Sequence, residues 1–394
     1  MRARLFRPGI SALLGPCSHW IQGRRVGLVS HPAAVDRRGT SSLDLLANHP
    51  SARLVSLFGP EHGFFGAAGA GETVKSTRLA PYGLPVHSLY GEHRRPTPSM
   101  LRGVDVIVFD LQDLGVRCYT YVSTLRYVLE AAAACGKTVV VADRPVPLPA
   151  TLDGPMLDPE FTSFVGLVPA PFVYGMTPGE AALWLRSELS LDVELKVAPM
   201  ANYRRQPSRE AGWPPWIPPS PGIRAWESAQ SYAATVFCEA VPAVDNGRGT
   251  SLAFQLIGAP WLDAEALLAR LSAARLGGVC FHRHTYIASF GAWSGKRIAG
   301  LRLTVTDAAA FRPVTTAIHI LHAIQAHHGR RRLWSGPQSN PAFFDKLFGT
   351  DVVRAALLDG AAPAEIAVAW PRARAAFSER RRSVLLYPPQ SRSS

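Results

Sequence analysis

Short apolar runs bounded by turn residues recur through the first half of the chain and predict buried strands. Each run is rich in β-branched side chains and stops at a glycine, a proline or a polar loop. We expect strands at 25–30, 54–58, 104–110, 138–142 and 193–198.

Helix-period patterns fall between these runs. They cover residues 41–48, 123–134 and 178–189. The third pattern opens with a capping signal, in which Thr177 precedes Pro178 and Glu180. Because strands and helices alternate, the pattern predicts parallel pairing with right-handed crossovers. The expected fold class is α/β, with a Rossmann-like parallel sheet domain over residues 1–235.

The pattern changes after residue 235 and predicts a smaller α+β C-terminal domain over residues 236–394. Here helices are expected at 264–274 and 314–327, and strands at 280–284, 302–306 and 384–387. His282 and His284 point the same way on one of these strands, but no third ligand follows nearby. We therefore expect no metal site.

Composition indicates a globular protein with a charged partner. The chain of 394 residues is 47% hydrophobic and 18% charged, which is ordinary for a packed domain. Its net charge of +13 favours an acidic partner. The arginine clusters at 330–332 and 380–382 lie in helical pattern and fit solvated faces. Because no zinc-finger, basic-zipper or RNA-binding signature accompanies them, we expect no nucleic-acid partner.

The five cysteines are scattered and match neither a disulfide framework nor a zinc pattern. No run of about twenty apolar residues exists, so no membrane span is expected. Pro8 and Gly9 interrupt the amino terminus before a signal-peptide core could form. We expect a soluble, cytoplasmic protein without a cofactor, with non-classical export left open.

Candidate chemistry begins on the glycine-rich loop at residues 56–66, which carries Glu61 and His62 directly after a strand. Polar side chains follow the next strands too. Because the carboxyl ends of parallel strands meet at one edge of a sheet, we expect a shared crevice. Its expected side chains are Glu61, His62, Asp110, Asp113, Arg117, Asp143 and Arg144. Taken singly, each charged residue could equally be a solvated or capping side chain.

The segment 213–226 is dense in proline and tryptophan. It is too stiff for a helix and too aromatic for a simple linker. Two interpretations stay open: a surface wrap over the domain boundary, or a wall of the cleft where indole rings meet sugar.

Six motifs together resemble the exo-acting β-N-acetylmuramidases of the NamZ type, in order and spacing. They are Gly-Pro-Glu-His-Gly at 59–63, Phe-Asp-Leu-Gln-Asp-Leu-Gly-Val-Arg at 109–117 with Tyr-Thr-Tyr at 119–121, Asp-Arg-Pro at 143–145, Gly-Met-Thr at 175–177, Gly-Arg-Gly-Thr at 247–250 and Gly-Ala-Pro-Trp at 258–261. The likeness implies a cleft between the two domains. It also implies release of N-acetylmuramic acid from the non-reducing end of peptidoglycan fragments, so that a disaccharide or muropeptide is the expected substrate.

Glycoside hydrolysis needs a carboxylic acid and usually a second carboxylate. We expect Glu61 to be the principal catalytic acid. Asp110, then Asp113, and lastly Glu239 are candidates for the second carboxylate. The lactyl carboxylate of muramic acid requires a cation or several donors. Arg117 is preferred for it over Arg144 and Arg248, while His62, Tyr119, Tyr121, Asp143 and Tyr174 are further expected substrate-binding residues.

Two departures from the family pattern concern specificity. Tyr174 stands where a histidine is usual before Gly-Met-Thr, and residues 239–246 fit the family loosely. A non-catalytic binder of muropeptides or another anionic sugar is therefore the alternative. A nucleotide-dependent Rossmann enzyme is disfavoured, because residues 30–34 lack the glycine fingerprint after the first strand.

Overall fold

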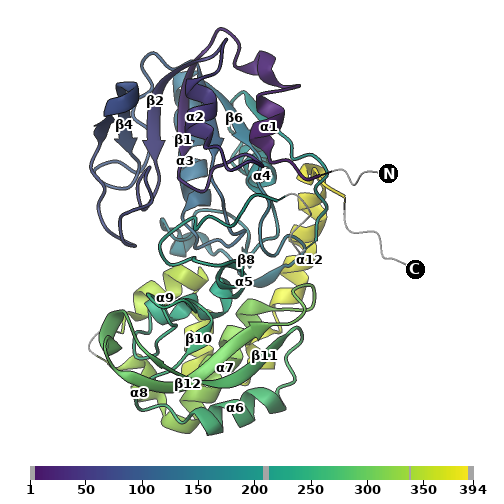
Figure 1. Cartoon of the computed structure of the whole chain (residues 1–394). Helices are drawn as coiled ribbons and strands as arrows, with labels where there is room; N and C mark the ends of the chain where they lie inside the picture. The colour runs from purple at the N-terminus through teal and green to yellow at the C-terminus, as the bar shows by residue number, and fades with distance from the viewer. Residues whose placement is uncertain (1–4, 207–212, 337–338, 389–394) are drawn as a thin grey trace.

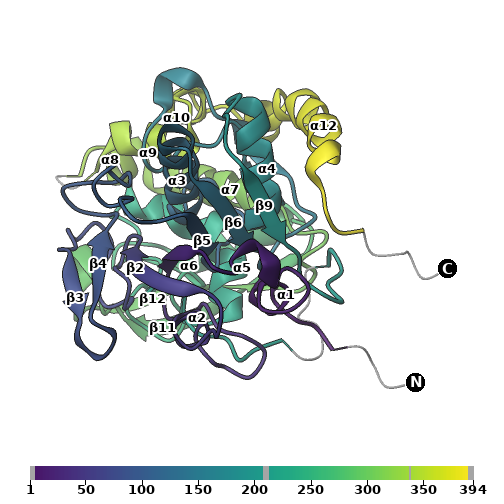
Figure 2. The same cartoon turned by 90° about the horizontal axis from the view of Figure 1, so that it is seen from above.

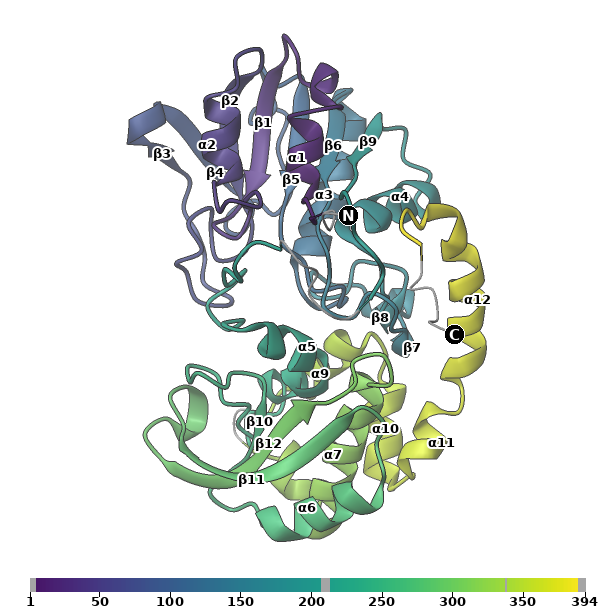
Figure 3. The ribbon, with the colours of Figure 1, turned by 45° about the vertical axis from the view of Figure 1, so that its right-hand side comes forward.

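The chain folds into two lobes, of which the first carries the large sheet and the second is mainly helical (Figure 1). The structure is a computed structural model that describes residues 5–206, 213–336 and 339–388. Figure 3 shows the lobes stacked, with the chain crossing between them more than once.

The sheet of the first lobe has seven strands in the order β3-β4-β2-β1-β5-β6-β9. Only the edge strand β3 is antiparallel to its neighbour. The six parallel strands, numbered along the chain, follow the order 3-2-1-4-5-6 of the Rossmann fold. The bounds are β1 Arg25–Ser30, β2 Arg53–Gly59, β3 Thr77–Leu79, β4 Leu84–Ser88, β5 Val106–Asp110, β6 Thr138–Ala142 and β9 Leu195–Ala198.

Helices cover both faces of this sheet because its strands are apolar on both sides. Val106 and Val108 of β5 pack with α1 (Gly9–Leu13) and α2 (Ser42–Ala47). The alternate residues Ile107 and Phe109 pack on the opposite side, in the cluster that holds the helices α3 and α4. These two span Tyr121–Cys135 and Pro178–Glu188. Figure 2 shows the same layers from above.

The second lobe packs helices around a small antiparallel sheet of order β10-β12-β11. Its strands are β10 Leu256–Ile257, β11 Val279–Ile287 and β12 Arg297–Val305. Its helices are α5 Trp226–Thr235, α6 Ala264–Ala273, α7 Pro313–His328, α8 Arg330–Trp334, α9 Pro341–Phe348, α10 Val352–Asp359, α11 Pro363–Ala367 and α12 Trp370–Arg380. The helix α5 contacts α7 and β12, so it packs with this lobe.

Two elements tie the lobes together. The hairpin of β7 (Asp153–Met156) and β8 (Pro171–Val173) belongs to the first half of the chain, yet the buried Asp153 caps α7 through the backbone N–H groups of Val314 and Thr315. The last helix, α12, runs back along the molecule to the first lobe (Figure 3), where Phe377 meets Trp184 of α4.

Short 3-10 turns complete the connections. They lie at η1 Ser18–Trp20, η2 Ala80–Tyr82, η3 Pro159–Phe161, η4 Val236–Glu239, η5 Gly291–Trp293 and η6 Arg381–Val384.

The α/β sheet and the α+β second lobe confirm the predicted fold class. One predicted strand is wrong: residues 384–387 follow η6 without joining a sheet. The pair β3 and β4 was not predicted, since both are short strands near one edge of the sheet with little apolar pattern. Within the described ranges, no helix is both long and apolar enough to cross a bilayer.

Candidate active site

A cavity of about 590 Å³ lies between the lobes and receives side chains from both. That volume suits a small ligand such as one or two sugar rings. The first lobe contributes the loops after β2 and β5, and the second contributes η4, the loop at 242–248, the β11–β12 turn and α9.

The loop after β2 is folded tightly so that Glu61 enters this cavity. At Gly59, a Cβ would lie 2.3 Å from the backbone nitrogen of Phe64, so only glycine fits. His62 adopts the left-handed region with φ of 70°. A histidine in that region is uncommon, and such conformations concentrate at functional sites.

Glu61 is held in one orientation by two hydrogen bonds. The backbone N–H of Gly71 donates to Oε1 at 2.9 Å, and the hydroxyl of Thr120 donates to Oε2 at 2.6 Å. Thr120 immediately precedes α3, so the carboxylate lies at the positive end of a long helix dipole. Only 8% of Glu61 is exposed. It is therefore a fixed, sheltered carboxyl group that still borders the cavity.

His62 is a neutral imidazole of defined tautomer. Its Nδ1 lies 2.8 Å from the carbonyl of Ala68 and donates to it. Burial lowers the pKa of His62, with that carbonyl and Glu61 acting in the opposite direction. Nε2 is then left as an acceptor on a side chain that borders the cavity.

The second lobe supplies another carboxylate, Glu239 at the end of η4. Its Oε1 lies 2.8 Å from Nη1 of Arg248, whose guanidinium also sits over the ring of Phe290. Burial raises the pKa of Glu239, Arg248 opposes this, and the charge of Glu61 raises it further. Two carboxylates, one from each lobe, therefore border one cavity, and the charge of Glu61 affects the pKa of Glu239.

Asp245 borders the cavity too, and its Oδ1 is hydrogen-bonded to the loop that carries Arg248 and to β11. It accepts from the hydroxyl of Tyr286 at 2.7 Å and from the N–H of Gly247 at 2.8 Å. Asp245 therefore sets the position of the loop.

Two of the predicted residues, Asp110 and Arg144, form a buried ion pair outside the cavity. Arg144 Nη2 donates to Asp110 at 3.0 Å, and Ser42 donates to the same carboxylate. Arg144 also reaches the carbonyl of Val35. Neither residue borders the cavity. The expectation that both line it is corrected: their charges satisfy each other and tie β5 and β6 to α2.

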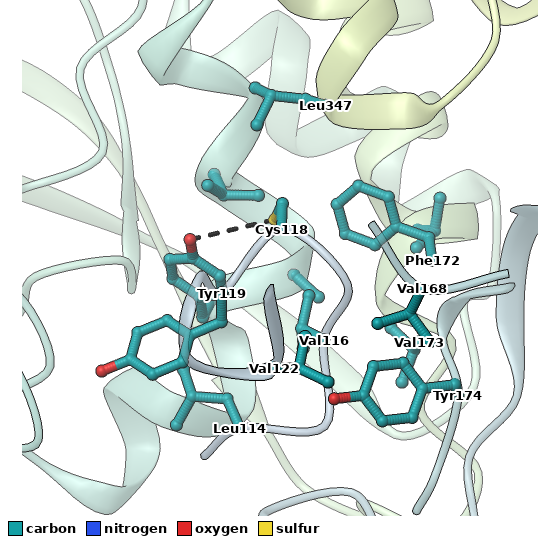
Figure 4. Packing of buried hydrophobic residues seen from close by; sticks show 14 of the residues in the cluster. Leu114, Val116, Cys118, Tyr119, Val122, Val168, Phe172, Val173, Tyr174 and Leu347 are labelled. Atoms are coloured by element: carbon teal, nitrogen blue, oxygen red, sulfur yellow. Dashed lines mark hydrogen bonds between the residues drawn. The ribbon is translucent and has the colours of Figure 1, made fainter. Parts of the chain in front are cut away.

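Asp113 and Tyr174 lie behind the cavity wall and contact each other. The Tyr174 hydroxyl donates to Oδ1 of Asp113 at 3.2 Å, and the N–H of Gly115 donates there at 2.7 Å. Burial raises the pKa of Asp113 to about 7. Figure 4 shows Tyr174 packed with Val116, Phe172 and Val173, so this departure from the family pattern falls in the core.

Asp143 and Arg117 are structural as well, which corrects two more expectations. Asp143 accepts from Thr177 and Gly179 at the start of α4 and from the hydroxyl of Tyr387. Arg117 is wholly buried and donates to three backbone carbonyls. They belong to Pro155, Ala170 and Phe348, which join the β7–β8 hairpin to the end of α9. Its guanidinium does not face the cavity.

At the place where a Rossmann fold binds a dinucleotide, the side chain of His31 is hydrogen-bonded within the protein. At the switch point between β1 and β5, His31 donates to the carbonyl of Pro219 and accepts from the N–H of Gln112 at 2.9 Å. Burial lowers the pKa of His31 to about 3, so it is neutral. In the part of the chain that the structure describes, no three His, Cys, Asp or Glu side chains gather as a metal site would need.

Two family models cover almost the whole chain. The N-terminal model of exo-β-N-acetylmuramidase NamZ matches residues 26–227, and the C-terminal model matches residues 230–387. The chain belongs to the NamZ family. The resemblance of the six motifs and the expected enzyme class, a glycosidase, are thereby confirmed.

Relatives of this NamZ-family chain match it over almost its full length. Peptidoglycan β-N-acetylmuramidase NamZ of Bacillus subtilis (strain 168) is 37% identical over 380 residues, which is 96% of this chain and 91% of the relative. Two crystal structures of DUF1343 family proteins from Bacteroides fragilis NCTC 9343 superpose on it. The first has a TM-score of 0.90 at 29% identity and covers 97% of this chain and 99% of its own, and the second has 0.78 at 26%, with 98% and 100%.

Of the predicted site residues in this NamZ-family chain, six border the cavity. They are Glu61, His62, Tyr119, Tyr121, Glu239 and Arg248. The proline- and tryptophan-rich segment contributes Ser220, Gly222 and Ile223 to the wall, while its indoles meet edge to face: Trp226 lies between Trp213 and Trp216. The segment forms part of the cavity wall, but none of these three indoles borders the cavity, so the interpretation in which indole rings meet sugar there is wrong. The surface wrap stays a prediction.

Sequence reasoning missed several cavity residues of this NamZ-family chain: Tyr90, Arg94, Thr120, Phe290, Trp293 and Lys346. Glu239 was ranked only third as the second carboxylate. Most of these residues lie in short loops or on a helix face, where the local pattern is the same as that of a solvated surface. The one available signal was that Thr120 is the middle residue of the Tyr-Thr-Tyr motif.

Proposed function

We propose that this chain is an exo-β-N-acetylmuramidase that releases N-acetylmuramic acid from the non-reducing end of peptidoglycan-derived disaccharides or muropeptides. Glu61 is the proposed catalytic acid and Glu239 the second carboxylate. The observation that carries this proposal is the pair itself: two carboxylates, one from each lobe, border one sugar-sized cavity. Family membership and the name of the Bacillus subtilis relative support the reaction.

The partners of the two carboxylates support this division of roles. Arg248 lies beside Glu239 and favours its charged form, against the burial that raises its pKa, and a charged carboxylate suits a group that attacks the sugar or activates water. Glu61 has a hydroxyl and an amide as partners instead of a cation. We therefore assign Glu61 to proton donation to the departing oxygen. His62 and Tyr119 are proposed to bind the sugar beside it.

Digestion of a defined disaccharide and of a longer glycan tests the reaction. Purified protein is incubated with N-acetylmuramyl-N-acetylglucosamine and with a glycan whose reducing end is labelled, and products are followed by mass spectrometry. Free N-acetylmuramic acid should appear first, only from the non-reducing end. Internal fragments, release of N-acetylglucosamine first, or no cleavage would contradict the proposal.

The role of Glu61 as the acid is tested separately by changing the leaving group of the substrate. Glu61→Gln should reduce disaccharide hydrolysis by roughly 10²–10⁴-fold, the usual contribution of general acid catalysis. A nitrophenyl muraminide, whose leaving group needs little protonation, should lose far less. If both substrates suffer equally, Glu61 is not the acid.

A further inference from the structure

Three arginine or lysine side chains border the cavity, and they differ in how their charge is used. Arg248 is paired with Glu239. For Arg94 and Lys346, no acidic partner lies within ion-pair distance among residues 5–206, 213–336 and 339–388. Arg94 and Lys346 are therefore two cations at the cavity without an ion-pair partner among the described residues.

Arg94 is held in place by aromatic rings and not by an acid. Its guanidinium carbon lies 4.6 Å from the ring centroid of Phe164 and 5.1 Å from that of Tyr90. The centroids of the two rings are 5.6 Å apart, and both rings contact the guanidinium. Cation–π contacts of this kind orient the planar group and leave its N–H edge available for a carboxylate.

Tyr90 connects this cation to the proposed catalytic acid. Tyr90 borders the cavity together with Glu61, and its ring contacts Arg94. Burial raises the pKa of Tyr90 to about 12, with the charge of Glu61 and a side-chain hydrogen bond to it acting in the same direction and Arg94 opposing them. Tyr90 therefore interacts with both the cation and the proposed acid.

Lys346 approaches the same wall from the second lobe. It lies on α9 between Phe343 and Leu347, both of which border the cavity. The α9 backbone touches the loop that carries Phe164: a Cβ on Gly166 would lie 3.4 Å from the carbonyl oxygen of Lys346. Arg94 and Lys346 therefore belong to one corner of the cavity although they come from different lobes.

We infer that Arg94 and Lys346 form a carboxylate-binding subsite that takes the acid carried on the 3-O-lactyl substituent of the sugar. This inference rests on the proposed function. N-acetylmuramic acid differs from N-acetylglucosamine by that substituent, so the subsite selects between the two sugars. Repulsion from Glu239, the proposed charged carboxylate, disfavours the reversed orientation, in which the carboxylate of the substrate would face the reacting end.

Binding measurements test the subsite without requiring catalysis. Affinity is measured by titration calorimetry for free N-acetylmuramic acid, for its uncharged lactyl amide and for N-acetylmuramyl-dipeptide, whose carboxylate lies on the peptide. Arg94→Gln and Lys346→Gln should each weaken binding of the acid by on the order of tenfold and leave the amide unchanged. Arg94→Lys keeps the charge but not the planar group that the rings orient, so it should bind the acid less tightly than the wild type and more tightly than Arg94→Gln.

The controls separate this inference from the proposed function. Arg95→Gln is the matched control, since Arg95 is paired with Glu130 and does not border the cavity. The loss should shrink as ionic strength rises, because the subsite is open to solvent. Loss confined to the dipeptide ligand would assign the subsite to the peptide. Equal losses for the acid and the amide, or none, would overturn the inference, whereas a wild-type protein that binds but never hydrolyses would defeat only the proposed function.

Discussion

Buried carboxylates at the strand ends of this protein serve the fold, and Asp113 illustrates their cost. One of its oxygens has two donors, while Oδ2 has no hydrogen-bond partner among the described atoms. Burial raises its pKa to about 7, so at higher pH the folded state must hold a charge that the unfolded chain carries in water. A carboxylate needed for chemistry at the surface of a cavity would not be placed this way.

Asp113→Asn should flatten the dependence of stability on pH. Because the folded pKa is raised above the unfolded value, Asp113 costs stability progressively as pH rises from about 4 to about 7. The wild type should therefore lose about 3 kcal/mol relative to the variant between pH 5 and pH 8. Urea unfolding at several pH values measures this.

Asp105→Asn is the control of opposite sign. Hydrogen bonds from Arg25 lower the pKa of Asp105 to about 2, so its favourable contribution is complete above about pH 4 and is lost as pH falls through that range. This variant should keep the wild-type slope between pH 5 and pH 8, because it still contains Asp113. A steep slope in Asp113→Asn, or a flat dependence in Asp105→Asn, would contradict the assignment to Asp113.

At the same residue scale, the sequence was informative only where local chemistry is unusual. Glu61 and His62 stand out because glycines and a proline surround them directly after a strand. Arg117 could not be interpreted correctly, since a guanidinium that binds three carbonyls in the core looks the same in sequence as one that binds a substrate. Arg94 and Lys346 gave no local signal at all.

At the scale of elements, the ion pair of Asp110 and Arg144 holds the ends of β5 and β6 against α2. Arg144→Met should destabilise the protein by about 3–5 kcal/mol, because it leaves the Asp110 carboxylate buried and uncompensated. The double variant Asp110→Leu/Arg144→Met should be less destabilised than the sum of the single changes. Free energies of unfolding from urea titrations complete the cycle, and strict additivity would contradict a coupled pair.

The parallel strands were predictable because each is an apolar run of the length that a buried strand requires. Residues 384–387 have the same pattern but join no sheet. Instead, the Leu386 N–H donates to Glu180 and the Tyr387 hydroxyl donates to Asp143, so the segment docks on the start of α4. Only the tertiary structure decides between these outcomes, since the local pattern fits both.

At the scale of the whole molecule, α12 acts as a strap from the second lobe to the first. Phe377 is 2% exposed and meets Trp184 edge-on at 4.8 Å. Phe377→Ala should lower the free energy of unfolding by about 3–5 kcal/mol through the cavity it leaves. It should also separate the unfolding of the two lobes.

The coupling between the two lobes is measured by asking whether two spectroscopic probes report the same unfolding transition. In the wild type, circular dichroism and tryptophan fluorescence should report one urea transition, and in Phe377→Ala they should diverge. Val368→Ala is the control. Val368 lies just before α12 and is 74% exposed, so this change should leave the unfolding transitions as they are in the wild type. Two separate transitions in the wild type would show that the strap does not couple the lobes.

The arrangement of both lobes around one cavity is what the sequence could not predict, since Glu61 and Glu239 are far apart along the chain. The central claim is that this pair, and not the acids that follow β5, carries the reaction. The most direct test is the kcat/KM of Glu239→Gln and of Asp113→Asn on N-acetylmuramyl-N-acetylglucosamine. The account predicts a loss of at least about 10²-fold for Glu239→Gln and a nearly unchanged value for Asp113→Asn. The reverse order would contradict it.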